Sequence, residues 1–175
     1  MSPDRTLERV LGVDPGTRRT GWGIVERDGS RLRLVDCGVI VAGDRKALEL
    51  RLAAIHAGLI AAIGAHSPGA AAIEDVFFAK YPNGALKLGH ARGVALLAAA
   101  QGGLEVHSYP PSVVKRAVSG GGRADKEQIA RVVGAILGTR ELPGHDATDA
   151  LALAITHLNA SRMPAALRAA AGRRR

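Results

Sequence analysis

Four acidic residues, far apart along the chain, have the types and settings expected of a divalent-metal site. Asp14 ends the first predicted strand, next to a Pro-Gly turn, and Glu74 interrupts the apolar run AAAIEDV. An unpaired carboxylate in an apolar strand is costly, so such an acid commonly binds a metal or a base, or takes part in catalysis. Asp146 and Asp149 lie three residues apart at the start of the last predicted helix, so they share one face.

Each acid also has a purely structural explanation when it is considered alone. Asp14 can cap its own turn, Glu74 can face outward from its strand, and the helical pair suits a helix N-terminus. If the first and fourth strands are neighbours and the last helix packs beside them, however, all four acids meet. Carboxylates gathered at one place repel one another unless divalent cations lie between them.

Such a cluster predicts a particular chemistry. Hard oxygen ligands, with no cysteine and no histidine pair among them, favour Mg²⁺, with Mn²⁺ able to substitute, over zinc. Two such ions about 3.5–4 Å apart can activate a water and stabilise the leaving oxygen of a phosphodiester. We therefore expect two ions per active site and hydrolysis of a nucleic acid. The expected metal ligands and catalytic residues are Asp14, Glu74, Asp146 and Asp149.

Hydrophobic periodicity and turn residues predict the elements that position these acids. Strands are predicted over 9–14, 21–27, 32–41, 70–76 and 104–109, with a tight Asp-Gly hairpin between the second and third. Helices are predicted over 46–65, 85–101, 112–118, 125–137 and 145–161. This order predicts an α/β fold with a mixed five-stranded sheet, its first three strands an antiparallel meander, and helices on both faces.

The composition fits one domain in a reducing compartment. The chain has 175 residues, of which 47% are hydrophobic, and we expect one domain over 9–161 with an N-terminal extension (1–8) and a basic C-terminal tail (162–175). A lone cysteine, Cys37, excludes an intramolecular disulfide framework. The start lacks a secretory signal, and a helix followed by a strand explains the uncharged run 53–73 better than a membrane span does. We expect a soluble, cytoplasmic protein.

Basic residues are spread unevenly and hint at an anionic partner. Removing the five arginines of 162–175 from the net charge of +8 leaves +3 for residues 1–161. That tail can be a solvated terminus or a non-specific phosphate-binding arm. Two acid-poor stretches lie within the body of the chain, and an aromatic pair follows Glu74. The candidate DNA-binding residues are Phe77, Lys80, Lys87, Arg92, Lys115, Arg116, Arg123 and Lys126.

Three segments together carry a family resemblance: VLGVDPGTRRTGWGIV (10–25), AAIEDVFFAKYPNGALKLGHARGVALLAAA (71–100) and HDATDALALAITH (145–157). They resemble the RuvC family of bacterial Holliday-junction resolvases, crossover junction endodeoxyribonucleases of the ribonuclease H-like superfamily. The likeness extends from about residue 9 to residue 160. DPGxxxTG, IExVF and DAxDALAxAxxH are each moderately specific, and in this order they are highly specific.

The resemblance implies a ribonuclease H-like fold, the residues of the active site, and the DNA and protein partners. The family's metal-binding acids fall on the four acids named above, although some members carry histidine where this chain has Asp146. It implies a homodimer that binds a four-way DNA junction and makes paired symmetric nicks, in recombination and repair of damaged DNA during the SOS response. It further implies that the protein acts together with the RuvA–RuvB branch-migration complex. By the same resemblance, Lys115 and Lys126 lie near the scissile phosphate, and Phe77 stacks on an unpaired base. Phe78 is expected to be buried or at a subunit contact, and His145 to be an outer-shell group or an exposed helix-start residue.

Three other functions fit parts of the pattern. The first segment also looks like the phosphate-binding hairpin of actin-like ATPases, but those proteins repeat the fold and need roughly twice this length. A non-catalytic junction-binding module would need only the basic surface, and it gains nothing from carboxylates beside phosphates. A related ribonuclease H-like nuclease acting on RNA shares the first motif but not the IEDVF and ALKLGHARG stretches.

Overall fold

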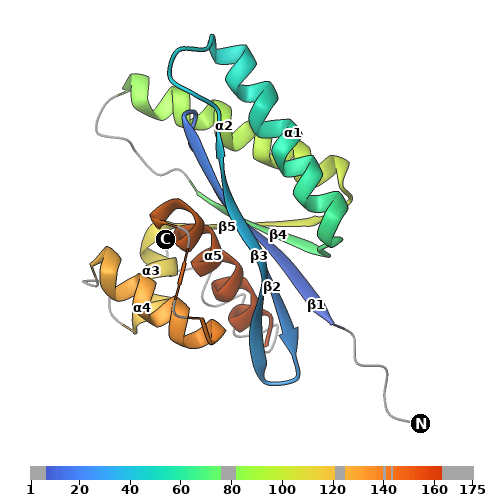
Figure 1. Cartoon of the computed structure of the whole chain (residues 1–175), viewed down its shortest axis with the longest axis vertical. Coiled ribbons are helices and arrows are strands. Elements are labelled where there is room, and N and C mark those ends of the chain that lie inside the picture. The colour runs from blue at the N-terminus through green and yellow to red at the C-terminus, as the bar shows by residue number, and fades with distance from the viewer. Residues whose placement is uncertain (1–6, 76–81, 121–124, 140, 143, 163–175) are drawn as a thin grey trace.

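The fold is built on one five-stranded sheet, in the order β3-β2-β1-β4-β5 (Figure 1). The computed structural model describes residues 7–75, 82–120, 125–139, 141–142 and 144–162. Strands β1, β2 and β3 form an antiparallel meander, and β4 and β5 run parallel to β1. The predicted mixed sheet is therefore confirmed. The strands are β1 (Glu8–Asp14), β2 (Arg19–Asp28), β3 (Arg31–Val41), β4 (Ala70–Glu74) and β5 (Glu105–Tyr109).

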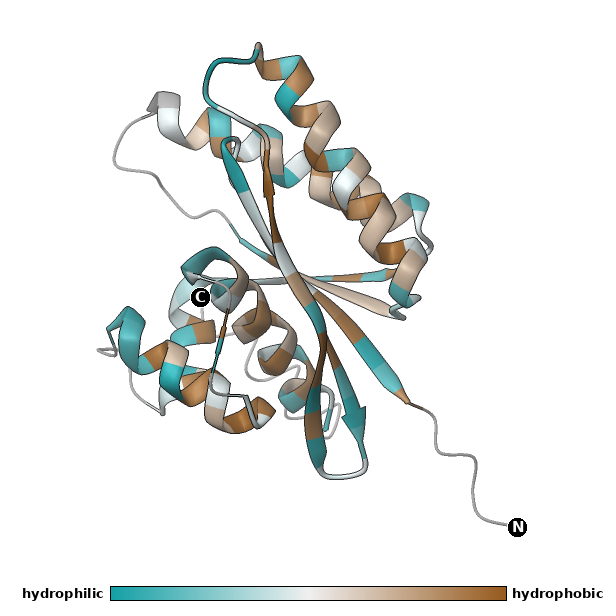
Figure 2. Ribbon diagram, in the orientation of Figure 1, coloured by the Kyte–Doolittle hydropathy of each residue, from teal (hydrophilic) through white to brown (hydrophobic). Residues whose placement is uncertain are grey.

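Helices cover both faces of the sheet and form two separate apolar cores (Figures 1 and 2). One core lies between the sheet and α3, α4 and α5, and the other lies between the sheet and α1 and α2. Each core buries one face of the same strands, as the two-sided apolar pattern of β1 and β4 requires. The helices are α1 (Leu48–His66), α2 (Pro82–Gln101), α3 (Pro111–Ser119), α4 (Lys126–Leu137) and α5 (His145–Ser161).

Helix α5 is the most enclosed element, because it lies almost directly on the sheet. Most of its residues between Ala147 and Leu158 are buried. Two strand glycines make this approach possible: a Cβ at Gly12 would collide with the backbone of α5 at Ala150, and one at Gly21 would collide with its first turn at Asp146. Side chains at these two positions would push the helix off the sheet, so the glycines set the height of α5 and of the acids that it carries.

Helix α1 has the length and apolar composition of a membrane-spanning helix, and it is the one such helix among the described residues. Its apolar residues are explained by packing, since Ile55, Leu59 and Ile63 belong to the core that α1 and α2 share with the sheet. A strand, β4, follows it directly. The interpretation of the uncharged run 53–73 as a helix followed by a strand is confirmed.

Element boundaries differ from the predicted ones by a few residues. Strand β2 begins two residues earlier than predicted, at Arg19, and α2 begins three residues earlier, at Pro82. The hairpin loop between β2 and β3 lies one residue later than the Asp-Gly signal, with Gly29 at φ 61°. The earlier start of β2 matters for the site, because it brings Arg19 to the sheet edge where the acids gather.

Candidate active site

Strand register places two of the four acids side by side. Strands β1 and β4 are parallel neighbours with Val13 opposite Ile73, so Asp14 and Glu74 each come next at the same carboxyl edge of the sheet. Interaction between their side chains raises the pKa of Asp14 and lowers that of Glu74. Burial, together with the charges of Glu74, Asp149 and Asp146, raises the pKa of Asp14 from 3.8 to about 7. The first strand thus ends in a carboxyl group that resists ionisation because it is buried and three other acids lie near it.

The other acids share this environment. Burial raises the pKa of Glu74, and the charge of Asp149 adds to the effect. Burial likewise raises the pKa of Asp149, which Lys126 and His145 lower in part. The positive charge of Lys115 lowers the pKa of both Glu74 and Asp149. The chain therefore brings acids from β1, β4 and α5 to one place and sets two lysines beside them.

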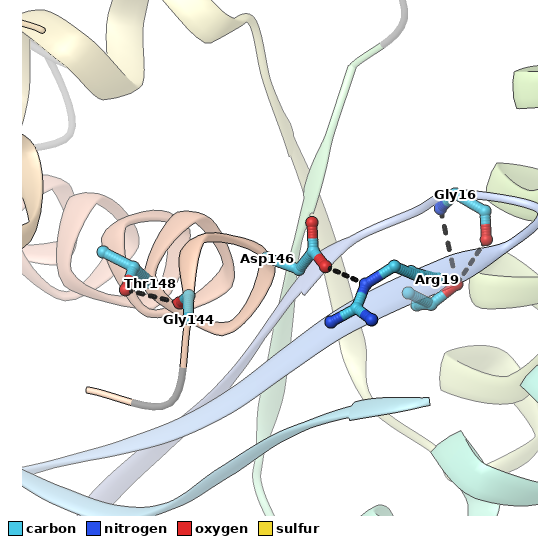
Figure 3. Close-up of polar contacts among 6 residues, drawn as sticks. Gly16, Arg19, Gly144, Asp146 and Thr148 are labelled. Atoms are coloured by element: carbon cyan, nitrogen blue, oxygen red, sulfur yellow. Dashed lines mark hydrogen bonds and ion pairs between the residues drawn. The ribbon is translucent and has the colours of Figure 1, made fainter. Parts of the chain in front are cut away.

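Among the four acids as the structure describes them, Asp146 differs because it forms an ion pair with an arginine (Figure 3). The Nε–H of Arg19, the first residue of β2, donates to Asp146 Oδ2 at 2.6 Å. Among the described residues, no three Asp, Glu, His or Cys side chains converge tightly enough in this conformation to hold a metal ion. Asp146 is instead paired with the Arg19 guanidinium in this conformation.

The remaining basic candidates divide into two groups. Lys87 on α2, Lys115 and Arg116 on α3, and Lys126 at the start of α4 are exposed. Arg92 on α2 instead makes two hydrogen bonds and an ion pair with other residues of the chain.

Arg92 ties α2 to the ends of two strands. Its Nε–H donates to the backbone oxygen of Glu74 at 3.2 Å, and its Nη2 donates to Ser108 Oγ at 2.8 Å. Nη2 also lies 3.3 Å from Asp75 Oδ1. Arg92 thus fixes the backbone of one of the four acids, a contact that spacing along the chain did not predict.

Other sequence candidates lie outside the described residues: Phe77, Phe78, Lys80, Arg123 and the basic tail beyond residue 162. His145 is described, and it is the exposed first residue of α5. Its charge lowers the pKa of Asp149, so the histidine is both exposed and electrostatically coupled to an acid.

Sequence reasoning missed Arg19 and the two packing glycines. The glycines Gly12 and Gly21 were visible in the first motif, but only the packing of α5 shows why side chains are excluded there. Arg19 follows another arginine, Arg18, whose Nε pairs with exposed Asp44 at 3.2 Å. Nothing in the sequence distinguishes the two, because the pairing of Arg19 depends on where the last helix begins.

Comparison with known proteins identifies the family. A sequence model described as "Crossover junction endodeoxyribonuclease RuvC" matches residues 10–157, which is most of the chain. The chain belongs to the RuvC family of crossover junction endodeoxyribonucleases. A RuvC of Azorhizobium caulinodans is 48% identical over 93% of this chain and 96% of its own length. A RuvC of Sorangium cellulosum is also 48% identical, over 92% of this chain and 90% of its own.

Solved structures agree with this assignment. The RuvC of Thermus thermophilus, in complex with a Holliday junction substrate, matches with a TM-score of 0.84 and 37% identity, over 89% of this chain and 96% of that one. The yeast mitochondrial Holliday junction resolvase Ydc2 matches with a TM-score of 0.61 at 14% identity, over 89% and 79% of the two chains. The second likeness supports the fold alone, whereas the first joins fold and sequence and confirms the expected family.

Proposed function

We propose that this protein is a metal-dependent endonuclease that resolves four-way DNA junctions by paired, symmetric nicks. The observation that carries the proposal is the meeting of Asp14, Glu74, Asp146 and Asp149, where burial and mutual repulsion raise the pKa of three of them. Membership of a family of crossover junction endodeoxyribonucleases supports the substrate. A module that only bound DNA would gain nothing from carboxylates placed next to phosphates.

The donor set fits Mg²⁺, or Mn²⁺ in its place. All four candidate ligands offer carboxylate oxygens. Burial and the neighbouring negative charges raise the pKa values of Asp14, Glu74 and Asp149, and a divalent cation would relieve that repulsion. Asp14 and Glu74 would hold the ions from the sheet, and Asp149 and Asp146 from α5. Two bound ions supply an activated water and stabilisation of the leaving oxygen of a phosphodiester. The chain itself holds the ligands in place, through the hydrogen bond of Arg92 to the Glu74 backbone.

Exposed basic side chains beside the acids would hold the DNA backbone. Lys115 and Lys126 lie near enough to Glu74 and Asp149 to lower their pKa values, so a phosphate bound to either lysine lies next to the acids. Arg116 and Lys87 extend the exposed basic surface along α3 and α2. We further propose that Phe77 stacks on an unpaired base and that Lys80 and Arg123 contact phosphates. These three residues lie outside the described part of the chain. Arg92 acts through Glu74 rather than on DNA.

An apolar groove on the opposite face of the sheet fits a second copy of the chain. A cavity of about 620 Å³ lies between α1 and α2, with Leu52, Leu86 and Leu97 in its lining. Leu86 and Leu97 are 64% and 51% exposed, which is unusual for leucines that gather in one groove. Gly89 and Gly93 also line it, so another helix could approach α2 closely. A homodimer joined here would carry two sets of acids, one for each of the two strands that must be nicked.

The dimer proposal can be tested with charge substitutions. Leu97→Glu should convert the dimer to a monomer in size-exclusion chromatography with light scattering, because a charge cannot be buried in this groove. Leu50→Glu is the matched control, since Leu50 is 58% exposed on α1 and does not line the groove. A Leu97→Glu protein that stays dimeric places the interface elsewhere.

The cellular setting follows from the reaction. A junction resolvase acts in homologous recombination and DNA repair, so we propose a cytoplasmic enzyme that works with the RuvA–RuvB branch-migration complex as part of the response to DNA damage. The net charge of +8 favours an anionic partner such as DNA, although five of these charges lie in the segment 162–175.

One assay tests the proposed function directly. A synthetic four-way junction and a linear duplex of the same sequence are each incubated with Mg²⁺, Mn²⁺ or chelator. Symmetric nicks confined to the junction, and absent in chelator, are expected. Cleavage of an RNA substrate in preference to the junction would favour the RNA-acting nuclease, and tight junction binding without cleavage under every condition would favour a binding module.

A further inference from the structure

Arg19 and Asp146 form the one ion pair that any of the four acids makes with an arginine side chain among the described residues. The Nε–H of Arg19 donates to Asp146 Oδ2 at 2.6 Å (Figure 3). Both side chains are open to solvent, since 56% of Arg19 and 35% of Asp146 are exposed. A phosphate or a cation can therefore reach either partner from outside.

The backbone on both sides of this pair is held in place. Before Arg19, the turn is closed by Thr20, whose Oγ1 donates to the Gly16 oxygen at 2.8 Å and accepts from the Gly16 N–H at 3.3 Å. Thr20 is fully buried. At the start of α5, Thr148 Oγ1 donates to the Gly144 oxygen at 2.8 Å (Figure 3). The ion pair thus joins two backbone segments that are each held by hydrogen bonds, the turn before β2 and the first turn of α5.

A guanidinium on a carboxylate oxygen competes with a metal ion for that oxygen. The arginine occupies one oxygen of Asp146 by hydrogen bonding, and its positive charge repels a cation nearby. Arginine also binds phosphate well, because its planar donors match phosphate oxygens. Arg19 therefore has two possible partners in this enzyme, Asp146 and the DNA backbone.

We propose that Arg19 is a positioning residue that keeps Asp146 from binding metal until a DNA phosphate takes the guanidinium. The inference rests on the proposed function, because it assumes that Asp146 binds metal and that DNA lies beside it. Its consequence is that metal and junction strengthen each other's binding, since the phosphate that removes Arg19 frees an oxygen of Asp146. The enzyme would assemble its complete metal site on DNA rather than free in solution.

The neighbouring arginine provides a matched control. Arg18 carries the same charge one residue away, but its Nε lies 3.2 Å from Asp44 Oδ1, in a pair whose side chains are 72% and 64% exposed. Arg18→Gln and Arg19→Gln remove the same charge from almost the same position. Only the second frees Asp146.

The first measurement is Mn²⁺ binding without DNA, by isothermal titration calorimetry. Arg19→Gln should bind Mn²⁺ about three- to fivefold more tightly than wild type, the range expected for a partly exposed ion pair. Arg18→Gln should stay close to wild type. In an Asp146→Asn background, Arg19→Gln should have no further effect, because the competition it relieves is already gone.

The second measurement is junction affinity in chelator over a range of salt concentrations, by fluorescence anisotropy. Arg19→Gln should weaken binding and reduce the salt slope by about one phosphate contact. The inference is overturned if Arg19→Gln and Arg18→Gln change Mn²⁺ affinity equally, or if the gain persists in full with Asp146→Asn. If wild type still nicks the junction and binds Mn²⁺, either of these two outcomes rejects only the role proposed for Arg19 and leaves the proposed function standing. A wild-type protein that binds no Mn²⁺ would reject the metal proposal and this inference together.

Discussion

Replacing Asp14 with asparagine is expected to make the metal-free protein more stable while it abolishes nicking. In the folded protein the pKa of Asp14 is about 7, against 3.8 for an ordinary aspartate. Between these two values the folded state binds more protons than the unfolded state, so the free energy of unfolding falls as the pH rises. Above pH 7 the penalty is complete; it shrinks as the pH falls toward 3.8 and disappears below that value, where the carboxyl group is neutral in both states.

The size of the effect follows from the same two values. A change from 3.8 to about 7 corresponds to at most roughly 4 kcal/mol of lost stability at neutral to alkaline pH. The amide of an asparagine carries no charge and can still donate to Glu74, as a protonated Asp14 does. We therefore expect Asp14→Asn to stabilise the metal-free protein by roughly 2–4 kcal/mol at pH 8, and hardly at all at pH 4.

Urea unfolding in chelator, followed at several pH values between 4 and 8, measures this difference. Added Mg²⁺ should stabilise wild type and have much less effect on Asp14→Asn, because the variant has lost a ligand. Asp44→Asn is the control, since Asp44 is exposed and paired with Arg18, and it should show no such pH dependence. A stability difference that is the same at pH 4 and pH 8, or an Asp14→Asn protein less stable than wild type at pH 8, would refute the electrostatic reasoning.

The nicking rate should rise with pH over the range in which the stability of the metal-free protein falls. At fixed Mg²⁺ the nicking rate of wild type should rise with pH toward about 7, because Asp14 must lose its proton to bind a cation. More Mg²⁺ should move that rise to lower pH. Asp14→Asn should bind the junction at least as well as wild type, having lost a negative charge beside the phosphates, and should not cleave it.

Three further predictions concern the supports of the site and the DNA surface. Gly21→Ala should slow nicking roughly tenfold to a hundredfold, because the new Cβ collides with the first turn of α5, whereas Gly64→Ala, with open space around it, should leave nicking unchanged. Arg92→Gln should lower kcat more than junction affinity, and Arg92→Lys should recover part of the loss; a loss of affinity alone would assign Arg92 to phosphate binding. Alanine at Lys115 or Lys126 should weaken junction binding for every sequence tested and reduce the salt slope by about one, as filter binding at several salt concentrations would show.

The acids could be proposed from the sequence because each lies at the end or the start of a strongly patterned element. Asp14 and Glu74 end runs whose apolar residues predict buried strands, and parallel neighbours must place their carboxyl ends together. The same patterns predicted the antiparallel meander of the first three strands and suggested the first and fourth strands as neighbours, whereas the full strand order came from the structure. Local signals were therefore enough for the mixed sheet and for the expected meeting of the acids, but not for the place of every strand.

The partners of these acids could not be found in the same way. The contacts of Arg19 with Asp146 and of Arg92 with the Glu74 backbone join residues 127 and 18 positions apart. Each depends on the rotation of a helix and on the length of a side chain, neither of which has a periodic signature. Sequence reasoning accordingly grouped Arg92 with the DNA-binding residues, and it did not distinguish Arg19 from Arg18.

The enclosure of α5 has a consequence for how the site fails. Most of α5 is buried, so its amide protons should exchange with water only when the whole domain opens. Asp149 is fixed to that helix, and Asp14 is fixed to a strand beneath it. We therefore expect heating to leave the arrangement of these two acids intact up to the transition in which the fold itself is lost, so that inactivation and global unfolding share one midpoint.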